Sequence, residues 1–395
     1  MKKTRILAIL ITLLLVCSFV TAQDYQTKGL TASDRAMPTF YEKIKERMTF
    51  PLGWKDGNDP AQWKEKAFAK AEEIMIPYKD TTPFNMEVIA EEDRETYIAQ
   101  KVVFNVTGDS RVMALLLVPK GKGPFPAALM LHDHGSKFTI GKEKMVQTFG
   151  DDEVSQKRLT ESKGWAATYF SGKYPGDELA KRGYIVLSTD ALGWGDRSVN
   201  RWSTNSQQSL ACNMMNMGMT YAGLIAMEDV RSAEFLASLP KVDKTKVATV
   251  GFSMGAFRSW QTAALSDAVT AGVVDCWMAT MKGLMVEGNN QLKGQSAFTM
   301  LHPFIANYLD YSDVAGLAAP KPMLFFAGEQ DGLFPIPSVK EAFGNMEKIW
   351  TANNAAENLS TKIWPKGHEF TADMQQEAFD WLDATFKNKY KPRKR

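Results

Sequence analysis

Three polar residues in the second half of the chain have the types and the order needed for nucleophilic catalysis. Ser253 lies in the pattern GFSMG, and Asp331 and His368 follow it further along the sequence. A serine hydroxyl is a poor nucleophile until a base removes its proton, and that base must itself be oriented by a third group. The sequence therefore predicts Ser253 as the nucleophile, His368 as the general base and Asp331 as the carboxylate that orients the base.

Each of these residues follows a stretch with the composition of a buried strand. Ser253 comes after the apolar run VATV and before a segment that can form a helix, which is the strand-turn-helix layout of a nucleophile elbow. Asp331 ends PMLFFAGEQD, where Glu329 is the rival acid, and His368 follows TKIW. GFSMG alone is a weak signal because glycine and serine are common. Serine, acid and histidine in this order, each after a predicted strand, form the arrangement of α/β-hydrolases.

A catalytic serine of this kind also needs two N–H donors aimed at the oxyanion of the tetrahedral intermediate. We expect the backbone N–H of Met254, directly after the nucleophile, to be one donor. The segment HDHGSKF follows another predicted strand, and Ser136 in it is the candidate for the second. Gly135 before it would allow a close backbone approach.

The rest of the chain predicts the scaffold that would hold these groups. Short apolar runs such as AALML, YIVLST and PMLFF alternate with helix-like segments, and continuous apolarity indicates strands buried on both faces. We therefore expect a doubly wound, mostly parallel sheet of about eight strands, with helices on both faces and an antiparallel hairpin at its start. Two insertions, 137–175 and 197–220, follow predicted strand ends, where the ligand crevice of such a sheet lies.

The first residues have the pattern of an export signal. Basic residues precede the apolar run ILAILITLLLVCSFV and the small-residue site VTA, which predicts cleavage between Ala22 and Gln23. Lipid attachment at Cys17 is the alternative. We expect a signal peptide at 1–22, a helical extension at 23–83 and a catalytic domain at 84–395, with no membrane span after signal removal and a secreted or periplasmic location.

The composition argues against several classes of partner. A net charge of +2 lacks the basic excess of nucleic-acid-binding proteins. Cys212 and Cys276 could pair or remain buried thiols. His132 and His134 have a spacing that metal ligands use, but the sequence offers no further histidine-rich motif to complete a site, so we predict no metal.

Several segments resemble one known family. DVRSAEFLASLPKVDKTKVATVGFSMGA, GEQDGLFP and KGHEF resemble dienelactone hydrolase-like and acetyl xylan esterase-like α/β-hydrolases, and LHDHGSKFTIGKEK and DALGWGDR are similar to an exported bacterial branch of them. The resemblance covers the chain from about Phe84 onward and implies carboxylic ester hydrolysis without a cofactor. Ser253 stands where dienelactone hydrolases have cysteine, which argues against a dienelactone substrate. Ala256 replaces a glycine common after the elbow.

The resemblance and the export signal together favour deacetylation of carbohydrate esters. We expect a small-molecule or oligosaccharide ester in the crevice, with Trp194, Trp277 and His134 as substrate-binding residues. In DALGWGDR, an internal pair between Asp196 and Arg197 is favoured over substrate contact. The alternatives are a peptidase of the prolyl-oligopeptidase type, a uronate methyl esterase, a metal-dependent hydrolase and a noncatalytic binding homologue.

Overall fold

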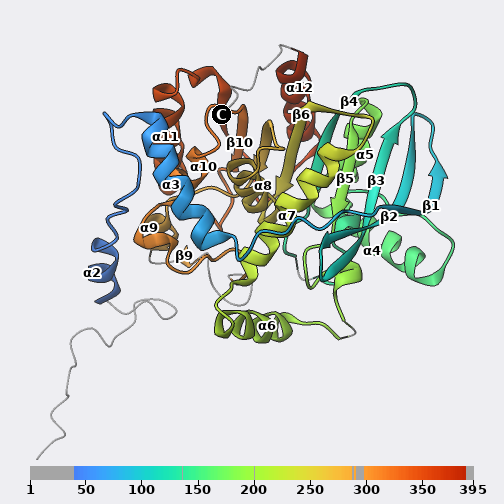
Figure 1. Ribbon diagram of the computed structural model, residues 1–395, viewed down its shortest axis with the longest axis horizontal. Coiled ribbons are helices and arrows are strands. Elements are labelled where there is room, and N and C mark those ends of the chain that lie inside the picture. The colour runs from blue at the N-terminus through green and yellow to red at the C-terminus, as the bar shows by residue number, and fades with distance from the viewer. Residues whose placement is uncertain (1–39, 136, 200, 287–288, 291–297, 388–395) are drawn as a thin grey trace, which may run out of the picture. The chain divides into compact units, whose positions relative to one another are not determined.

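The computed structural model describes residues 40–135, 137–199, 201–286, 289–290 and 298–387 (Figure 1). The chain divides into two compact units, Met1–Met48 and Thr49–Arg395. Helix α2 (Phe40–Glu46) is the described element of the first unit, and all other elements belong to the second. Among the described residues, no helix combines the length and apolar composition that a membrane span requires.

The second unit is built on a nine-stranded sheet with the strand order β1-β2-β3-β5-β4-β6-β7-β10-β11. The first three strands form an antiparallel meander, and β3 also pairs antiparallel with β5. The remaining neighbours are parallel. The strands are β1 (Glu87–Asp93), β2 (Tyr97–Thr107), β3 (Ser110–Pro119), β4 (Phe125–Leu131), β5 (Ile185–Thr189), β6 (Val242–Phe252), β7 (Ala271–Asp275), β10 (Met323–Gly328) and β11 (Leu359–Trp364).

Helices cover both faces of this sheet, which is why its central strands are buried along nearly their whole length. On one face, α4 (Glu153–Tyr169), α5 (Pro175–Lys181) and α12 (Ala372–Lys387) share a core with the strands. The opposite face carries α7 (Tyr221–Ser238), α8 (Met254–Leu265) and α11 (Ile336–Ala352), with α7 in front of the sheet in Figure 1. The predicted α/β architecture is confirmed.

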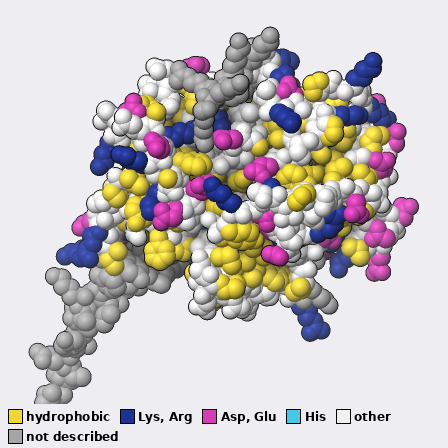
Figure 2. Space-filling view, in the orientation of Figure 1, with side chains coloured by type: hydrophobic (Ala, Val, Ile, Leu, Met, Phe, Trp, Pro, Cys, Tyr) yellow, Lys and Arg dark blue, Asp and Glu magenta, His cyan; other side chains and the backbone are white. Residues whose placement is uncertain are grey.

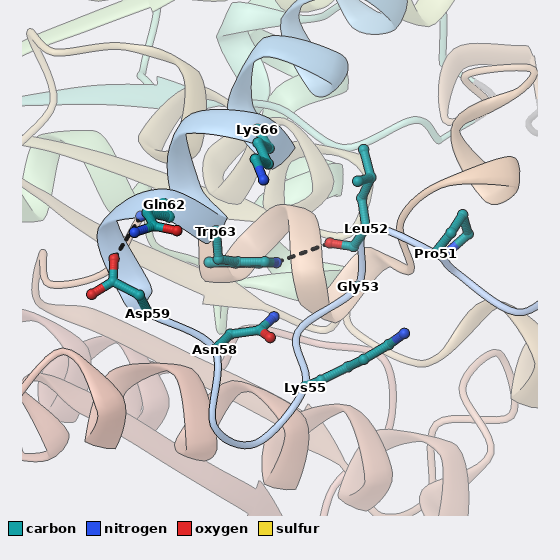
Figure 3. Close-up of a pocket in the computed structure, with 9 residues that line it drawn as sticks. All are labelled: Pro51, Leu52, Gly53, Lys55, Asn58, Asp59, Gln62, Trp63 and Lys66. Atoms are coloured by element: carbon teal, nitrogen blue, oxygen red, sulfur yellow. Dashed lines mark hydrogen bonds between the residues drawn. The ribbon is translucent and has the colours of Figure 1, made fainter.

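Helix α3 (Pro60–Met75) shows how the segment before the sheet is attached to it. Asp59 caps the helix by accepting a hydrogen bond from the backbone N–H of Gln62, and Pro60 occupies the first turn, where a missing N–H costs nothing. One apolar face of the helix is buried, and the Nε1 of Trp63 donates to the carbonyl of Leu52 beside a cavity of about 270 Å³ (Figure 3). The helix therefore packs as part of the second unit.

The two insertions leave the sheet after β4 and β5, as their positions predicted. The first contains η1 (Lys142–Lys144) and α4, and the second contains η2 (Gly195–Arg197) and α6 (Thr204–Asn216). The expected pair between Asp196 and Arg197 is wrong. Arg197 pairs with Glu228 at 2.5 Å, while Asp196 accepts from Lys142 at 2.5 Å, because the two neighbouring side chains serve different elements.

One face of the described chain is mixed in charge. Figure 2 shows basic and acidic side chains interspersed over the face toward the viewer, with apolar areas between them. A nucleic-acid-binding protein would gather its lysine and arginine side chains on one face or along one helix. On the face in view, the basic side chains of the described residues are not gathered in this way.

Candidate active site

Ser253 sits on the sharp turn between β6 and α8. Its backbone has φ 57° and ψ −123°, a conformation that side-chain-bearing residues rarely adopt. The flanking glycines are needed because the chain passes very close to itself: a Cβ atom on Gly251 would lie 2.0 Å from the carbonyl oxygen of Gly255. The backbone N–H of Ser253 is held by the carbonyl of Asp275 at 2.9 Å. This strained turn lifts the serine hydroxyl off the end of the strand.

The structure brings the three predicted catalytic residues into one hydrogen-bonded chain. The Ser253 hydroxyl lies 2.8 Å from Nε2 of His368, and Nδ1 of His368 lies 2.6 Å from Oδ2 of Asp331. The other carboxylate oxygen of Asp331 accepts the backbone N–H of Leu333 at 2.9 Å. A neutral imidazole with its proton on Nδ1 can donate to Asp331 and accept from Ser253, which is the arrangement that lets it take the serine proton.

The acid and the base of this hydrogen-bonded chain differ in burial. Asp331 is buried after β10, whereas Glu329, the rival acid, is exposed. His368 keeps a partly exposed ring in the loop after β11, where Phe252 and Phe334 flank it with ring centroids 4.8 Å and 6.4 Å away. A fixed acid and a base that solvent or substrate can reach are both requirements of proton transfer.

A second acidic residue and a thiol lie beside this chain. Asp275 ends β7 and is fully buried, and burial raises the pKa of its carboxyl well above the usual range. The thiol of Cys276 lies 3.6 Å from Asp275, and burial likewise raises the pKa of that thiol. Cys276, Asp331 and His368 each offer a possible metal-ligand atom within 4.8 Å of the others. Of the two carboxyl groups, it is Asp331 that contacts the imidazole of His368, at 2.6 Å.

The two cysteines of the described chain do not pair. Cys212 is exposed on α6, and Cys276 is buried beside Asp331, and both thiols are free within the described residues. Of the two options left open by the sequence, the buried free thiol applies to Cys276 alone.

Of the two candidate oxyanion donors, Met254 lies within the described residues and Ser136 does not. Met254 is the first residue of α8, so its backbone N–H directly follows the nucleophile. Ser136 lies outside the described residues. The preceding segment, 132–135, is described and lies next to the elbow, because β4 and β6 are neighbours with Leu131 opposite Gly251.

The histidines of this loop are held by hydrogen bonds to protein groups. Nε2 of His132 accepts the backbone N–H of Ala191 at 3.0 Å, and Nδ1 donates to the carbonyl of Asp133 at 2.8 Å. Both ring nitrogens are thus engaged, and burial lowers the pKa of His132 well below its usual value. His134 is half-buried, its Nε2 lies 3.0 Å from the Gln207 amide oxygen, and burial lowers its pKa to about 4.

The structure corrects the expectation for the two tryptophans. Trp194 is 0% exposed, its ring is tilted against that of His132 and edge-on to that of His134, and its Nε1 donates to the carbonyl of His134 at 2.7 Å. Trp277 is 1% exposed and packs against Phe257 and other rings. Neither indole presents a face on which a sugar ring could stack. Large aromatic side chains after strand ends fill space between the elements here.

A comparison with protein families shows to which of them the chain belongs. Residues 23–380 match a family described as the Abhydrolase family. The chain belongs to this family. A curated relative, "Putative hydrolase YtaP" of Bacillus subtilis (strain 168), is 26% identical over 304 residues, which cover 77% of this chain and 93% of the relative.

Solved structures show the same fold at low identity. A "putative acetyl xylan esterase" from Bacteroides fragilis NCTC 9343 superposes with a TM-score of 0.63 and 16% identity, over 85% of each chain. A glucuronoyl esterase from Solibacter usitatus gives a TM-score of 0.60 and 14% identity, over 86% of this chain and 98% of that one. The predicted α/β-hydrolase fold and the resemblance to this group of hydrolases are confirmed.

Proposed function

We propose that this chain is an exported serine ester hydrolase that removes short acyl groups, acetyl above all, from carbohydrate esters. One observation carries the reaction type. His368 stands between Ser253 and Asp331 at hydrogen-bond distance from both, 2.8 Å and 2.6 Å. This is the geometry that nucleophilic catalysis by serine requires.

The chemistry follows from these contacts. Ser253 Oγ attacks the ester carbonyl while its proton passes to Nε2 of His368, and Asp331 stabilises the imidazolium that forms. The imidazolium then protonates the leaving alcohol, which leaves the acyl group on Ser253. In the second half, His368 removes a proton from water while the water oxygen attacks the acyl carbonyl. The tetrahedral intermediate then collapses, the bond to Ser253 Oγ breaks, His368 returns its proton to that oxygen, and the carboxylic acid departs. The backbone N–H of Met254 is the proposed donor to the oxyanion in both halves.

The proposed substrate class is supported by the names of proteins with a similar fold. Structural neighbours include proteins named as an acetyl xylan esterase and as glucuronoyl esterases. Acetyl removal and uronate methyl ester cleavage both pass through the same acyl transfer to serine, so the triad alone does not choose between them. The uronate methyl esterase is therefore the second candidate. Because Trp194 and Trp277 are buried, recognition of the sugar falls to other residues in either case.

Export is supported by the charged start and the apolar run of residues 1–22, which lie outside the described residues. The family match begins at residue 23, directly after the proposed cleavage site. Intact-mass analysis of exported protein should give a chain that begins at Gln23. A retained signal or a lipid on Cys17 would contradict this part of the proposal.

The test of function is a substrate panel with wild type and Ser253→Ala. Acetylated xylo-oligosaccharides, methyl glucuronate esters, a peptide anilide and p-nitrophenyl esters of increasing chain length should be compared. Acetate release from the sugars is expected to be fastest, and Ser253→Ala and His368→Ala are each expected to lower it by about 10³-fold or more, because the triad acts as a unit. Activity within tenfold of wild type in either variant would refute the triad. Methanol release without acetate release would select the uronate esterase instead.

A further inference from the structure

The loop that leaves β4 beside the elbow is held by buried donors at three successive carbonyls. The carbonyl of His132 accepts from the guanidinium of Arg258 at 3.3 Å. The carbonyl of Asp133 accepts from Lys144 at 3.3 Å. The carbonyl of His134 accepts from Lys144 at 3.1 Å and from the indole N–H of Trp194 at 2.7 Å. The orientation of each peptide plane in this loop is therefore fixed by a side chain from another part of the fold.

Lys144 is the charged one of the two donors to the His134 carbonyl, and it is 0% exposed. Its ammonium also contacts Oδ1 of Asp133 at 3.3 Å and lies 4.5 Å from the centre of the Trp165 ring. Trp165 in turn donates to Oδ2 of Asp133 at 3.0 Å. Burying an ammonium group is costly unless it is paired and hydrogen-bonded. The ammonium of Lys144 is compensated by Asp133 and by two backbone carbonyls of the loop.

The loop is close to the reaction because of how β4 and β6 meet. Leu131, the last residue of β4, is opposite Gly251 at the start of the elbow. A peptide unit is planar and trans, so its N–H points away from its C=O. The two donors on the carbonyl of His134 therefore direct the N–H of Gly135 away from Lys144 and Trp194. Gly135 has φ 36°, and a Cβ atom there would lie 2.2 Å from the Trp165 ring, so the approach tolerates only glycine.

We propose that Lys144 is a positioning residue that polarises the His134–Gly135 peptide and so strengthens the Gly135 N–H as a donor to the oxyanion. This rests on the proposed function, since it assigns a second donor to the same site. Hydrogen bonds in a chain polarise one another, and a charged donor on the carbonyl makes the N–H of the same peptide a stronger donor. The ammonium thus acts on the oxyanion through one peptide unit without touching substrate.

The chain supplies a matched control. Lys142 is two residues away in the same short helix and is also buried, but its ammonium pairs with carboxylates, at 2.7 Å from Asp190 and 2.5 Å from Asp196. It makes the same kind of buried ion pair without contacting the 132–135 carbonyls in the contacts of the described residues. Lys142→Met therefore reports the cost of disturbing this region, and Lys144→Met reports that cost together with the loss of polarisation.

The experiment compares both variants in the complete mature chain. Steady-state kinetics with p-nitrophenyl acetate gives kcat and KM, and inhibition by an alkyl boronic acid measures affinity for a tetrahedral adduct on Ser253. For Lys144→Met we expect kcat and boronate affinity to fall together by about 10- to 100-fold, less than the 10²- to 10³-fold typical of removing a whole oxyanion donor. KM should stay within about threefold, because ground-state binding does not use this donor. Lys144→Arg, which keeps the charge, should restore part of both losses.

The outcomes separate this inference from the proposed function. If Lys144→Met and Lys142→Met lose boronate affinity equally, Lys144 is only a structural residue and the inference is wrong. If Lys144→Met does not fold, Lys144→Gln serves instead, because it keeps a polar donor at this place and removes only the charge. Wild-type boronate affinity in that variant would also overturn the inference. Activity that survives in Ser253→Ala would instead refute the proposed function, whatever the lysine variants do.

Discussion

Gly255 lies so close to Leu131 that a Cβ atom on Gly255 would stand 1.8 Å from the Leu131 carbonyl oxygen. The second glycine of GFSMG is therefore where helix α8 touches the end of β4, and the contact sets how the elbow meets the neighbouring 132–135 loop. The obstructing atom belongs to the main chain, so no side-chain rotation can make room for a methyl group.

Gly255→Ala should therefore damage both stability and catalysis. Either α8 or the end of β4 must shift, and overpacking of this kind costs about 1–3 kcal/mol or more. We expect a lower midpoint in urea unfolding and a loss of ester hydrolysis larger than the loss of folded protein explains. Gly344→Ala on α11 is the control, since nothing lies within 4 Å of its added Cβ. That change should leave activity intact and stabilise the helix by about 0.5–1 kcal/mol.

The backbone conformation of Ser253 leads to a second prediction, which separates the effect of backbone strain on stability from the role of the hydroxyl in catalysis. At φ 57° and ψ −123°, a residue with a Cβ atom is strained, by about 1–3 kcal/mol for such positions in general. Ser253→Gly and Ser253→Ala should both be inactive, but Ser253→Gly should be the more stable of the two by about 1 kcal/mol. Thermal and urea unfolding of the two inactive proteins measure this difference. Equal stabilities would mean that the turn is relaxed in solution.

The contact between Asp331 and His368 predicts the effect of removing charge but not shape. In Asp331→Asn the side-chain amide no longer favours a proton on Nδ1, so the imidazole populates the tautomer that cannot accept from Ser253. We expect kcat on p-nitrophenyl acetate to fall by orders of magnitude, but by less than in Ser253→Ala or His368→Ala. Circular dichroism controls for the fold. A variant that kept a tenth of wild-type activity would point to another residue as the orienting acid.

The residues of the proposed triad could be predicted from the sequence because each of them follows a strand whose apolar run is visible. Once strands are placed, their carboxyl ends meet at one edge of a parallel sheet, so Ser253, Asp331 and His368 had to converge. Strand β1 was not separately predicted, because it lies at the sheet edge with mostly exposed side chains and lacks the apolar signature. The extent of insertion helices α4 and α6 was equally invisible, since their buried faces are narrow.

The side chains around the loop could not be predicted in the same way. Lys142 and Lys144 in GKEK look like surface residues, yet both are buried, because the insertion folds back onto carboxylates such as Asp190, which is distant in sequence. The prediction that Trp194 and Trp277 contact substrate was wrong, because both are buried. The sequence shows an aromatic residue after a strand end but does not show whether its side chain points to the core or to the substrate. Exposure depends on the partners that tertiary structure brings.

Metal removal should leave the activity unchanged. Both ring nitrogens of His132 are hydrogen-bonded to backbone groups, and Nε2 of His134 is hydrogen-bonded to Gln207, so these nitrogens are already occupied and do not offer a metal site. The mature enzyme dialysed against EDTA should retain its rate on p-nitrophenyl acetate. Loss of activity on chelation, with recovery on adding zinc, would favour a metal-dependent reaction and contradict the serine mechanism.

Asp310 predicts a dependence of stability on pH. Burial raises the pKa of this carboxyl to about 7, against the lowering effect of hydrogen bonds from the backbone N–H groups of Met281 and Tyr311, while Asp313 and Glu341 raise the pKa further. In the unfolded chain an aspartate has a pKa near about 3.9. Between pH 4 and pH 7 the folded state therefore holds a proton that the unfolded state has lost. The contribution of this group to the free energy of unfolding falls as pH rises through that window, and it is lowest above pH 7.

Asp310→Asn removes this titration while keeping an oxygen that can accept from the same two N–H groups. Relative to wild type, the variant should gain stability between pH 4.5 and pH 8, and one pKa unit corresponds to about 1.4 kcal/mol. Urea unfolding of both proteins at the two pH values measures the difference, in which the buried histidines cancel because both proteins contain them. Asp109→Asn, at an exposed turn, is the control and should change by no more than about 0.5 kcal/mol at either pH. If the Asp310→Asn difference were the same at pH 4.5 and pH 8, the carboxyl of Asp310 would have to be charged in the folded protein throughout that range, despite its burial.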